Sequence, residues 1–170
     1  MRALETKRLL LRKFHSVDLK DIAGWEEVSG ASSAEVAARG FLDFCFREYR
    51  AGGIGPWAML LKESRKIVGN CGFPHLDLKR NSAEVNYYVS PKHRGLGLAT
   101  EALKALMRFG FEDMGLVQIL ARCDGANVGS ERVMQKAGMT FKETVPPDRP
   151  FGQEGRAERL YVALRVSYFT

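Results

Sequence analysis

Cysteine and histidine are scarce in this 170-residue chain, with three of each. Cys45, Cys71 and Cys123 lie far apart and form no C-x-x-C pair. The histidines are equally scattered and lack the spacing of metal ligands. Disulfides and a metal site are therefore not expected, and a reducing, cytoplasmic location fits the composition.

Long apolar runs are also missing, so we expect no membrane-spanning helix and no signal peptide. Basic residues exceed acidic ones by 26 to 20, which gives a net charge of +6 and a pI near 9.4. They form no long run and are not interleaved with aromatic residues, so no nucleic acid partner is expected. The positive charge could attract a polyanionic cofactor, or the surface could simply be basic. The length fits a single domain over residues 1–170.

Hydrophobic periodicity and turn residues divide the chain into strands and helices. Short polar turns between the strands that follow residue 55 indicate an antiparallel meander. The pattern predicts a mixed α/β (α+β) fold with a mostly antiparallel central sheet of about seven strands and four helices. We expect strands at 5–14, 56–61, 67–73 (continuing towards 78), 83–89, 116–123, 139–145 and 156–169, and helices at 16–28, 33–50, 99–114 and 128–137.

Several side chains receive a predicted orientation from the same periodicity. Helical spacing indicates that the second helix buries Val36, Ala37, Phe41, Phe44 and Cys45. On the third helix, Glu101 is expected on the solvent side, paired with Lys104 and Arg108. Glycines at 69 and 72 inside a strand suggest a bulge or a closely packed neighbour.

One loop, Ser90–Ala102, combines features of an anion site. Gly95 and Gly97 stand next to Arg94, between an apolar strand and the start of a helix. Glycines let backbone N–H groups approach a ligand, and a helix N-terminus carries partial positive charge, so the loop could hold a phosphate or pyrophosphate. An ordinary strand-to-helix turn would look similar. A P-loop is excluded because no Gly-Lys-Ser/Thr follows, and a dinucleotide fingerprint lacks its third small residue at Thr100.

The order of residues in this loop resembles a known family. The Arg94–Ala99 segment is similar to the R/Q-x-x-G-x-G/A motif of the GNAT N-acetyltransferases. Thr6–Arg12 and Asn127–Met139 are similar to two further motifs, T-x-R-L-x-L-R and N-x-x-S…K-x-G-F, of the branch that contains the ribosomal-protein N-terminal acetyltransferases. The chain departs from the family at Asn86, where glycine is common, and at Met139, where phenylalanine is usual.

The resemblance implies an enzyme that transfers an acetyl group from acetyl-CoA directly to a primary amine in a ternary complex. It implies that the cofactor lies between two diverging strands, at 83–90 and 116–123. Glu84 is the expected general base and Ser130 the expected general acid. The implied cofactor-binding residues are Tyr88, Val89, Arg94, Gly95, Leu96, Gly97, Leu98, Ala99, Thr100, Asn127 and Ser130.

Each catalytic role has a plain structural alternative. Asn127 and Ser130 suit a helix start as capping residues. Glu84 could be a surface carboxylate, and Glu154 and Glu158 are weaker options for the base.

The acceptor is the least determined part of the prediction. At pH 7, deprotonating a lysine amine costs roughly 4.6 kcal/mol, whereas an α-amine costs only about 1 kcal/mol. A protein N-terminus is therefore the favoured acceptor when the base is uncertain. The alternatives are an acetyltransferase for a small amine or antibiotic, or a non-catalytic CoA-binding module. The chain is expected to be a monomer or a homodimer. Trp25, Phe44 and Phe151 would line an acceptor pocket or simply belong to the core.

Overall fold

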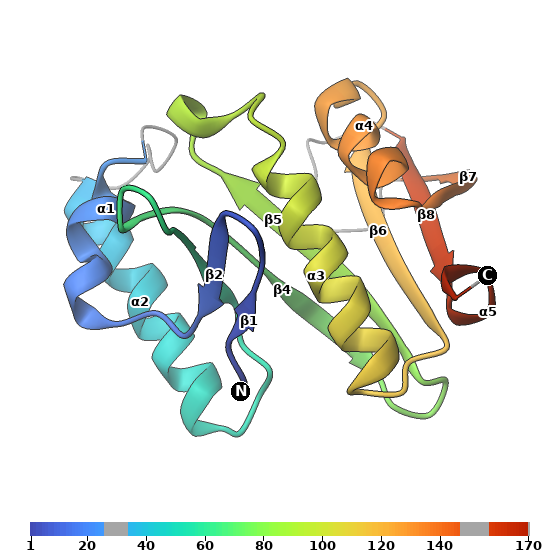
Figure 1. Ribbon diagram of the computed structural model, residues 1–170, viewed down its shortest axis with the longest axis horizontal. Coiled ribbons are helices and arrows are strands. Elements are labelled where there is room, and N and C mark those ends of the chain that lie inside the picture. The colour runs from blue at the N-terminus through green and yellow to red at the C-terminus, as the bar shows by residue number, and fades with distance from the viewer. Residues whose placement is uncertain (26–33, 147–156, 170) are drawn as a thin grey trace.

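A computed structural model describes residues 1–25, 34–146 and 157–169 of the chain. Their strands form one sheet in the order β1-β2-β3-β4-β5-β6-β8-β7 (Figure 1). Neighbouring strands run antiparallel except for β5 and β6, which run parallel. The strands are β1 (Leu4–Glu5), β2 (Leu9–Arg12), β3 (Trp57–Leu61), β4 (Lys66–Asp77), β5 (Ser82–Val89), β6 (Gln118–Asp124), β7 (Thr140–Val145) and β8 (Glu158–Leu164).

Five α-helices accompany the sheet in the described part of the chain: α1 (Leu19–Ala23), α2 (Ala34–Arg50), α3 (Leu98–Glu112), α4 (Val128–Ala137) and α5 (Arg165–Tyr168). The mixed, mostly antiparallel sheet and the meander of β3, β4 and β5 confirm the sequence prediction. The expected numbers, seven strands and four helices, are each one too low.

The extra strand comes from the start of the chain. The expected strand at 5–14 is two strands, because Thr6 N donates a hydrogen bond to Leu9 O (2.9 Å) and turns the chain back. Leu4 of β1 then pairs with Leu11 of β2.

The extra helix comes from the end of the described chain. The expected strand at 156–169 ends at Leu164, and α5 follows it. There the backbone N–H of Arg165 donates to Val117 O (3.0 Å), and the Tyr168 ring packs 5.0 Å from the Phe111 ring.

The first helix is shorter than expected. A 3-10 turn at Ser16–Asp18 precedes α1, which ends at Ala23 before Gly24. Residues 26–28 of the expected helix lie outside the described residues.

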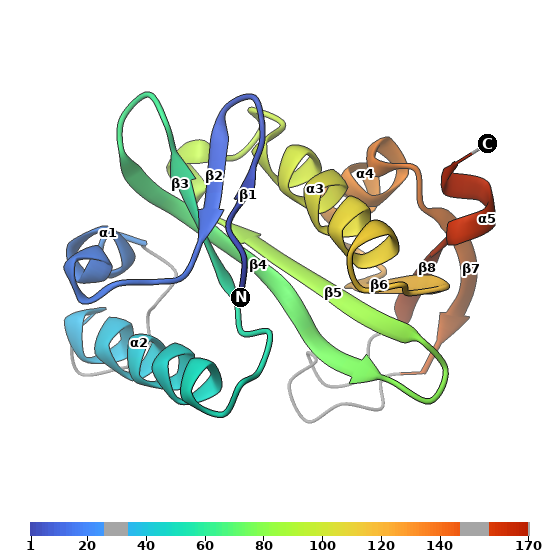
Figure 2. The same cartoon turned by 60° about the horizontal axis from the view of Figure 1, so that its bottom comes forward.

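Two layers of helices cover opposite faces of the sheet (Figure 2). α3 and α4 pack on one face and contribute Leu103, Leu106 and Met134 to the larger core. α1 and α2 pack on the other face around Ile22 and Leu42. No helix of the described segments is long and apolar enough to cross a membrane.

The buried side of α2 agrees only in part with the one expected: Cys45 is buried, and the Phe41 ring packs 5.2 Å from the Phe14 ring. Ala38, Leu42 and Cys45 face the core, whereas Val36 and Phe44 are about half exposed (55% and 44%). Ala38 and Leu42, which the periodicity did not indicate, thus join Phe41 and Cys45 in the contact with α1 and the sheet.

The glycine at 69 is required by a close approach of β4 and β5. A Cβ atom at this position would lie 2.1 Å from Tyr88 O, which no side chain can tolerate. The expectation of a closely packed neighbour at this glycine is confirmed, and the contact fixes β4 against the end of β5.

Candidate active site

β5 and β6 separate in the middle of the sheet. They pair over three positions only, from Ser82 with Gln118 to Glu84 with Leu120. Beyond this point β5 pairs with β4 alone and β6 with β8 alone. Figure 1 shows the two strands diverging towards the loop before α3 and the start of α4. The expected divergence of these strands is thereby present.

The loop at the end of β5 leads into α3 through two left-handed glycines. Gly95 and Gly97 both have φ of +77°, a conformation that other residues adopt only with strain. Gly97 is the N-cap residue, and no side chain of the described residues caps the helix there. The first intrahelical bond runs from Glu101 N to Gly97 O (3.1 Å). The N–H groups of residues 98–100 therefore have no partner within the helix and are available to an anion.

Arg94 is exposed and ties the loop to the end of β5. Its Nε donates to Val89 O (3.1 Å), and its guanidinium lies 5.8 Å from the centre of the Tyr88 ring. The Tyr88 ring in turn lies 5.2 Å from Trp25. The expected cofactor residues Tyr88, Val89 and Arg94 thus form one contact group at the open end of β5.

Of the expected acceptor-pocket residues, the structure describes Trp25 and Phe44, and they differ in burial. Trp25 is buried in the core between the sheet and α1–α2, where its Nε1 donates to Ile67 O (3.3 Å). Phe44 is partly exposed on α2, and Phe151 lies outside the described residues. Trp25 therefore fits the core alternative.

Asn127 and Ser130 lie at the start of α4, across the divergence from the loop. Asn127 Oδ1 accepts a hydrogen bond from Ser130 N (3.0 Å), so Asn127 is an N-cap residue. The hydroxyl of Ser130 lies 2.7 Å from the Tyr87 hydroxyl, which also donates to Ser130 O (3.0 Å). Burial raises the pKa of Tyr87 to about 12, so this phenol stays protonated.

Sequence reasoning missed Tyr87. The usable signal was the Tyr87-Tyr88 pair, since consecutive strand residues point to opposite faces of a sheet. Tyr88 packs with the α1–α2 core, so Tyr87 must point towards α3 and α4.

Glu84 lies where β5 and β6 begin to separate, on the same face as Tyr88 by strand alternation. Its side chain is only 12% exposed, and its Oε2 lies 3.7 Å from Arg122 Nε on β6. Arg122 Nη1 lies 3.8 Å from Glu158 Oε2 on β8. Glu84 is therefore a largely buried carboxylate at a strand junction and not a surface residue. Glu154, the other alternative base, lies outside the described residues.

The three cysteines are buried and carry no disulfide. Burial raises the pKa of Cys123 to about 11 and that of Cys45 to about 12, and it raises the pKa of Cys71 as well. These thiols therefore remain protonated near neutral pH and are poor nucleophiles.

A mixed sheet with a diverging parallel strand pair, and a helix start whose N–H groups are available to an anion, is the arrangement expected of an acyltransferase that uses acyl-CoA. Residues 8–140 match the family described as "Acetyltransferase (GNAT) domain". The chain belongs to this family and is an N-acetyltransferase, an enzyme class that takes acetyl-CoA and an amine acceptor.

Relatives of known sequence or structure agree with this assignment. The uncharacterised N-acetyltransferase YnaD of Bacillus subtilis (strain 168) is 26% identical over 97% of this chain and 98% of its own length. The ribosomal L7/L12 α-N-protein acetyltransferase RimL, solved in complex with coenzyme A, superposes with a TM-score of 0.79 at 12% identity and covers 96% and 98% of the two chains. A spermidine N-acetyltransferase SpeG chimera from Vibrio cholerae and hSSAT also superposes with a TM-score of 0.79, at 14% identity over 96% and 99%. At these identities the solved structures establish the fold alone.

Proposed function

We propose that this N-acetyltransferase acetylates the α-amine of a protein N-terminus by direct transfer from acetyl-CoA in a ternary complex. The observation that carries the proposal is the separation of β5 and β6 beyond Glu84, with the glycine loop at one arm and Ser130 at the other. Between the separated strands, backbone groups are left without a strand partner and can bind an extended ligand arm.

The chain would hold the cofactor at both arms. The amides of Gly95 to Thr100 bind the pyrophosphate, helped by the partial positive charge of the α3 N-terminus and by exposed Arg94. Backbone near Tyr88 and Val89 binds the pantetheine arm as a strand would. Asn127 contributes from α4, and the Val89 amide stabilises the oxyanion of the thioester.

The base and the acid would approach the reacting carbonyl from opposite faces of the sheet. Glu84 points to the face of α1 and α2, and accepts the proton of the attacking amine through intervening water, since five strand positions separate it from Val89. Ser130 lies on the face of α3 and α4, next to Tyr87, and donates a proton to the departing sulfur. Such a division keeps the base and the acid apart, so that the new C–N bond can form and the C–S bond can break at one carbon without proton exchange between them.

Direct transfer is favoured over an acyl-cysteine intermediate because a cysteine nucleophile reacts as its thiolate. Cys123, on β6, is the cysteine nearest this site in sequence, and burial raises its pKa to about 11. An attack on the thioester by this thiol at neutral pH is therefore unfavourable.

An α-amine acceptor is favoured by the cost of deprotonation. A single carboxylate that already faces Arg122 can manage the roughly 1 kcal/mol needed by an α-amine more easily than the roughly 4.6 kcal/mol needed by a lysine. RimL acts on a protein α-amine and SpeG on spermidine, and both superpose equally well, so the fold itself does not choose between these acceptors.

An acceptor screen tests the proposal. Acetyl-CoA binding is measured by calorimetry, and thiol release is then followed with free N-terminal peptides, N-terminally blocked lysine peptides, polyamines and aminoglycosides. We expect turnover with the free N-termini. Turnover confined to blocked lysine peptides or small amines would reject the acceptor, and binding without any turnover would indicate a CoA-binding module.

A further inference from the structure

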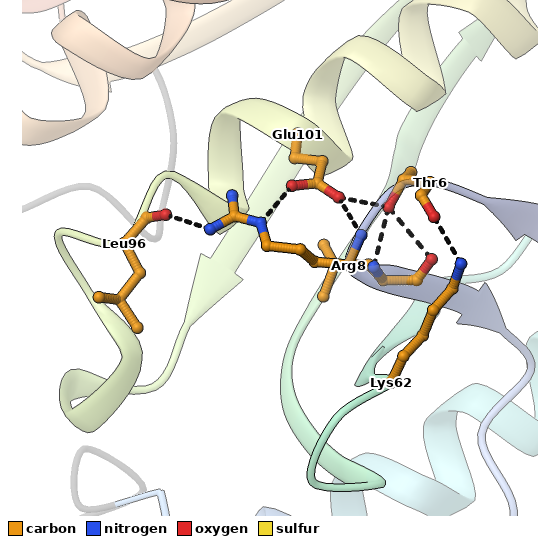
Figure 3. A network of polar contacts seen from close by, with 6 residues as sticks. Thr6, Arg8, Lys62, Leu96 and Glu101 are labelled. Atoms are coloured by element: carbon orange, nitrogen blue, oxygen red, sulfur yellow. Dashed lines mark hydrogen bonds and ion pairs between the residues drawn. The ribbon is translucent and has the colours of Figure 1, made fainter.

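We propose that Arg8 positions the anion-binding loop and neutralises a carboxylate beside it, and so sets the affinity for the cofactor's phosphates. The inference rests on the proposed function, because it assumes that this loop meets the pyrophosphate. Arg8 lies in the turn between β1 and β2, far in sequence from the loop, yet Figure 3 shows its guanidinium between Leu96 and Glu101.

Arg8 makes three hydrogen bonds to this region. Its Nη1 donates to Leu96 O (2.8 Å), its Nε to Glu101 Oε2 (2.7 Å), and its backbone N–H to Glu101 Oε1 (2.7 Å). Thr6 Oγ1 adds a bond to Glu101 Oε1 (2.6 Å), and Lys62 Nζ holds the turn by donating to Thr6 O (2.6 Å). The turn, the loop and the first turn of α3 are thus one connected unit (Figure 3).

The bond to Leu96 O controls the direction of an amide. Leu96 stands between two left-handed glycines, and its own side chain is exposed. In a trans peptide the C=O of one residue and the N–H of the next point in opposite directions. When Arg8 holds Leu96 O inward, the N–H of Gly97 must point away from Arg8, towards the side where the phosphate would lie.

The bond to Glu101 removes an unfavourable charge. Glu101 lies in the first turn of α3, next to the helix N–H groups that would bind a dianion. An uncompensated carboxylate there would repel the phosphates, and Arg8 neutralises it at 2.7 Å. The remaining nitrogen, Nη2, donates no hydrogen bond within the described segments and lies 3.6 Å from the position of a Cβ on Gly97. The guanidinium therefore also places its positive charge against the loop backbone.

A double-mutant cycle on the full-length protein tests the inference, with the dissociation constant of CoA as the readout. Arg8→Gln should raise this Kd about tenfold or more, because a charged hydrogen-bonded partner is lost. Glu101→Gln keeps an acceptor for Thr6 and removes the charge, so adding it to Arg8→Gln should recover part of the affinity. Arg8→Lys keeps the charge but not the planar, forked geometry of the guanidinium. Its Kd for CoA should lie between those of the wild type and Arg8→Gln.

Two comparisons separate this role from a general loss of structure. Arg2→Gln removes a similar arginine that pairs with Asp113 at the other end of α3 (2.6 Å), and should leave the Kd of CoA unchanged. The KM of acetyl-pantetheine, which lacks the phosphates, should rise far less in Arg8→Gln than the Kd of CoA does.

Three results would overturn the inference: an unchanged Kd in Arg8→Gln, a further loss on adding Glu101→Gln, or equal losses for acetyl-pantetheine and CoA. A wild-type protein that does not bind CoA would instead reject the proposed function, and this inference with it.

Discussion

Glu84 and Ser130 lie on opposite faces of the gap between β5 and β6, and each is held by a neighbour. Arg122 faces Glu84 at 3.7 Å, and Tyr87 contacts Ser130 at 2.7 Å. The two residues therefore have different proposed roles, base for Glu84 and acid for Ser130, and variants of each should have different effects.

Glu84→Gln should lower kcat roughly fivefold near pH 7, because the base offsets the roughly 1 kcal/mol that deprotonating an α-amine costs there. The Kd of acetyl-CoA should not change. With an α-amine acceptor the deficit should shrink as the pH rises through about 7.8, because the neutral amine then no longer needs the base. Pre-steady-state rates over this pH range provide the measurement, with Glu143→Gln on exposed β7 as the control. An equal deficit at every pH would mean that Glu84 is structural.

Ser130→Ala and Tyr87→Phe should lower kcat in the same direction, by about tenfold for the serine and less for the tyrosine. Because the two hydroxyls act as a unit, the double variant should be no slower than Ser130→Ala alone. Tyr49→Phe serves as a stability control. It removes a hydroxyl that lies away from the gap and donates a hydrogen bond to Pro56 O (2.6 Å). If the losses in kcat of the two single variants multiply in the double variant, the two hydroxyls do not act as a unit.

At the scale of elements, the loop before α3 depends on glycine conformation and not only on space. A Cβ at Gly97 would meet only Arg8 Nη2 at an ordinary 3.6 Å, so the strain there comes from the left-handed backbone. The same holds for Gly115 beyond the end of α3, where φ is +71° and no atom lies within 4 Å of the Cβ position. The two glycines therefore differ mainly in their distance from the anion site.

Gly97→Ala and Gly115→Ala should each cost about 1 kcal/mol of stability. Only Gly97→Ala should weaken acetyl-CoA binding, because it changes the amides at the α3 N-terminus. Thermal melting and calorimetry on both variants test this. Equal affinities for acetyl-CoA would place the phosphate site elsewhere.

The contact of α3 with the β1–β2 turn should be sensitive to acid. Burial of Glu101 raises its pKa, but hydrogen bonds from Thr6 and Arg8 outweigh that effect and the net pKa lies below 4.5. A carboxylate whose pKa is lowered in the folded state stabilises the protein when the pH is above the ordinary pKa. This contribution disappears as the pH falls through the pKa of the folded state. The free energy of unfolding, measured with urea, should therefore fall less below pH 4.5 in Glu101→Gln than in the wild type. Identical acid dependence would contradict the contact.

At the scale of the whole molecule, local signals predicted most of the fold. The cap at Asn127 and the glycine at 138 set the bounds of α4, and the polar turns set the meander. Features that depend on distant contacts were missed. The split of the first strand depends on the Thr6–Leu9 turn, and the end of β8 depends on contacts with Val117 and Phe111.

The same distinction applies to the site. The order of residues in the loop predicts an anion site, because that signal is continuous in sequence. Glu101 was expected to pair with Lys104 and Arg108 on its own helix, but it bonds Thr6 and Arg8 instead. Partners that the fold brings together from separate segments, such as Tyr87 and Ser130, leave no periodic trace in the sequence.

Transfer from acetyl-CoA to an α-amine can be tested directly in one experiment. A peptide with a free N-terminus and an internal lysine is incubated with the enzyme and acetyl-CoA at neutral pH, and the modified position is mapped by tandem mass spectrometry. We expect an acetyl group on the N-terminal residue, formed several times faster by the wild type than by Glu84→Gln. Acetylation of the lysine alone, or of neither amine, would contradict it.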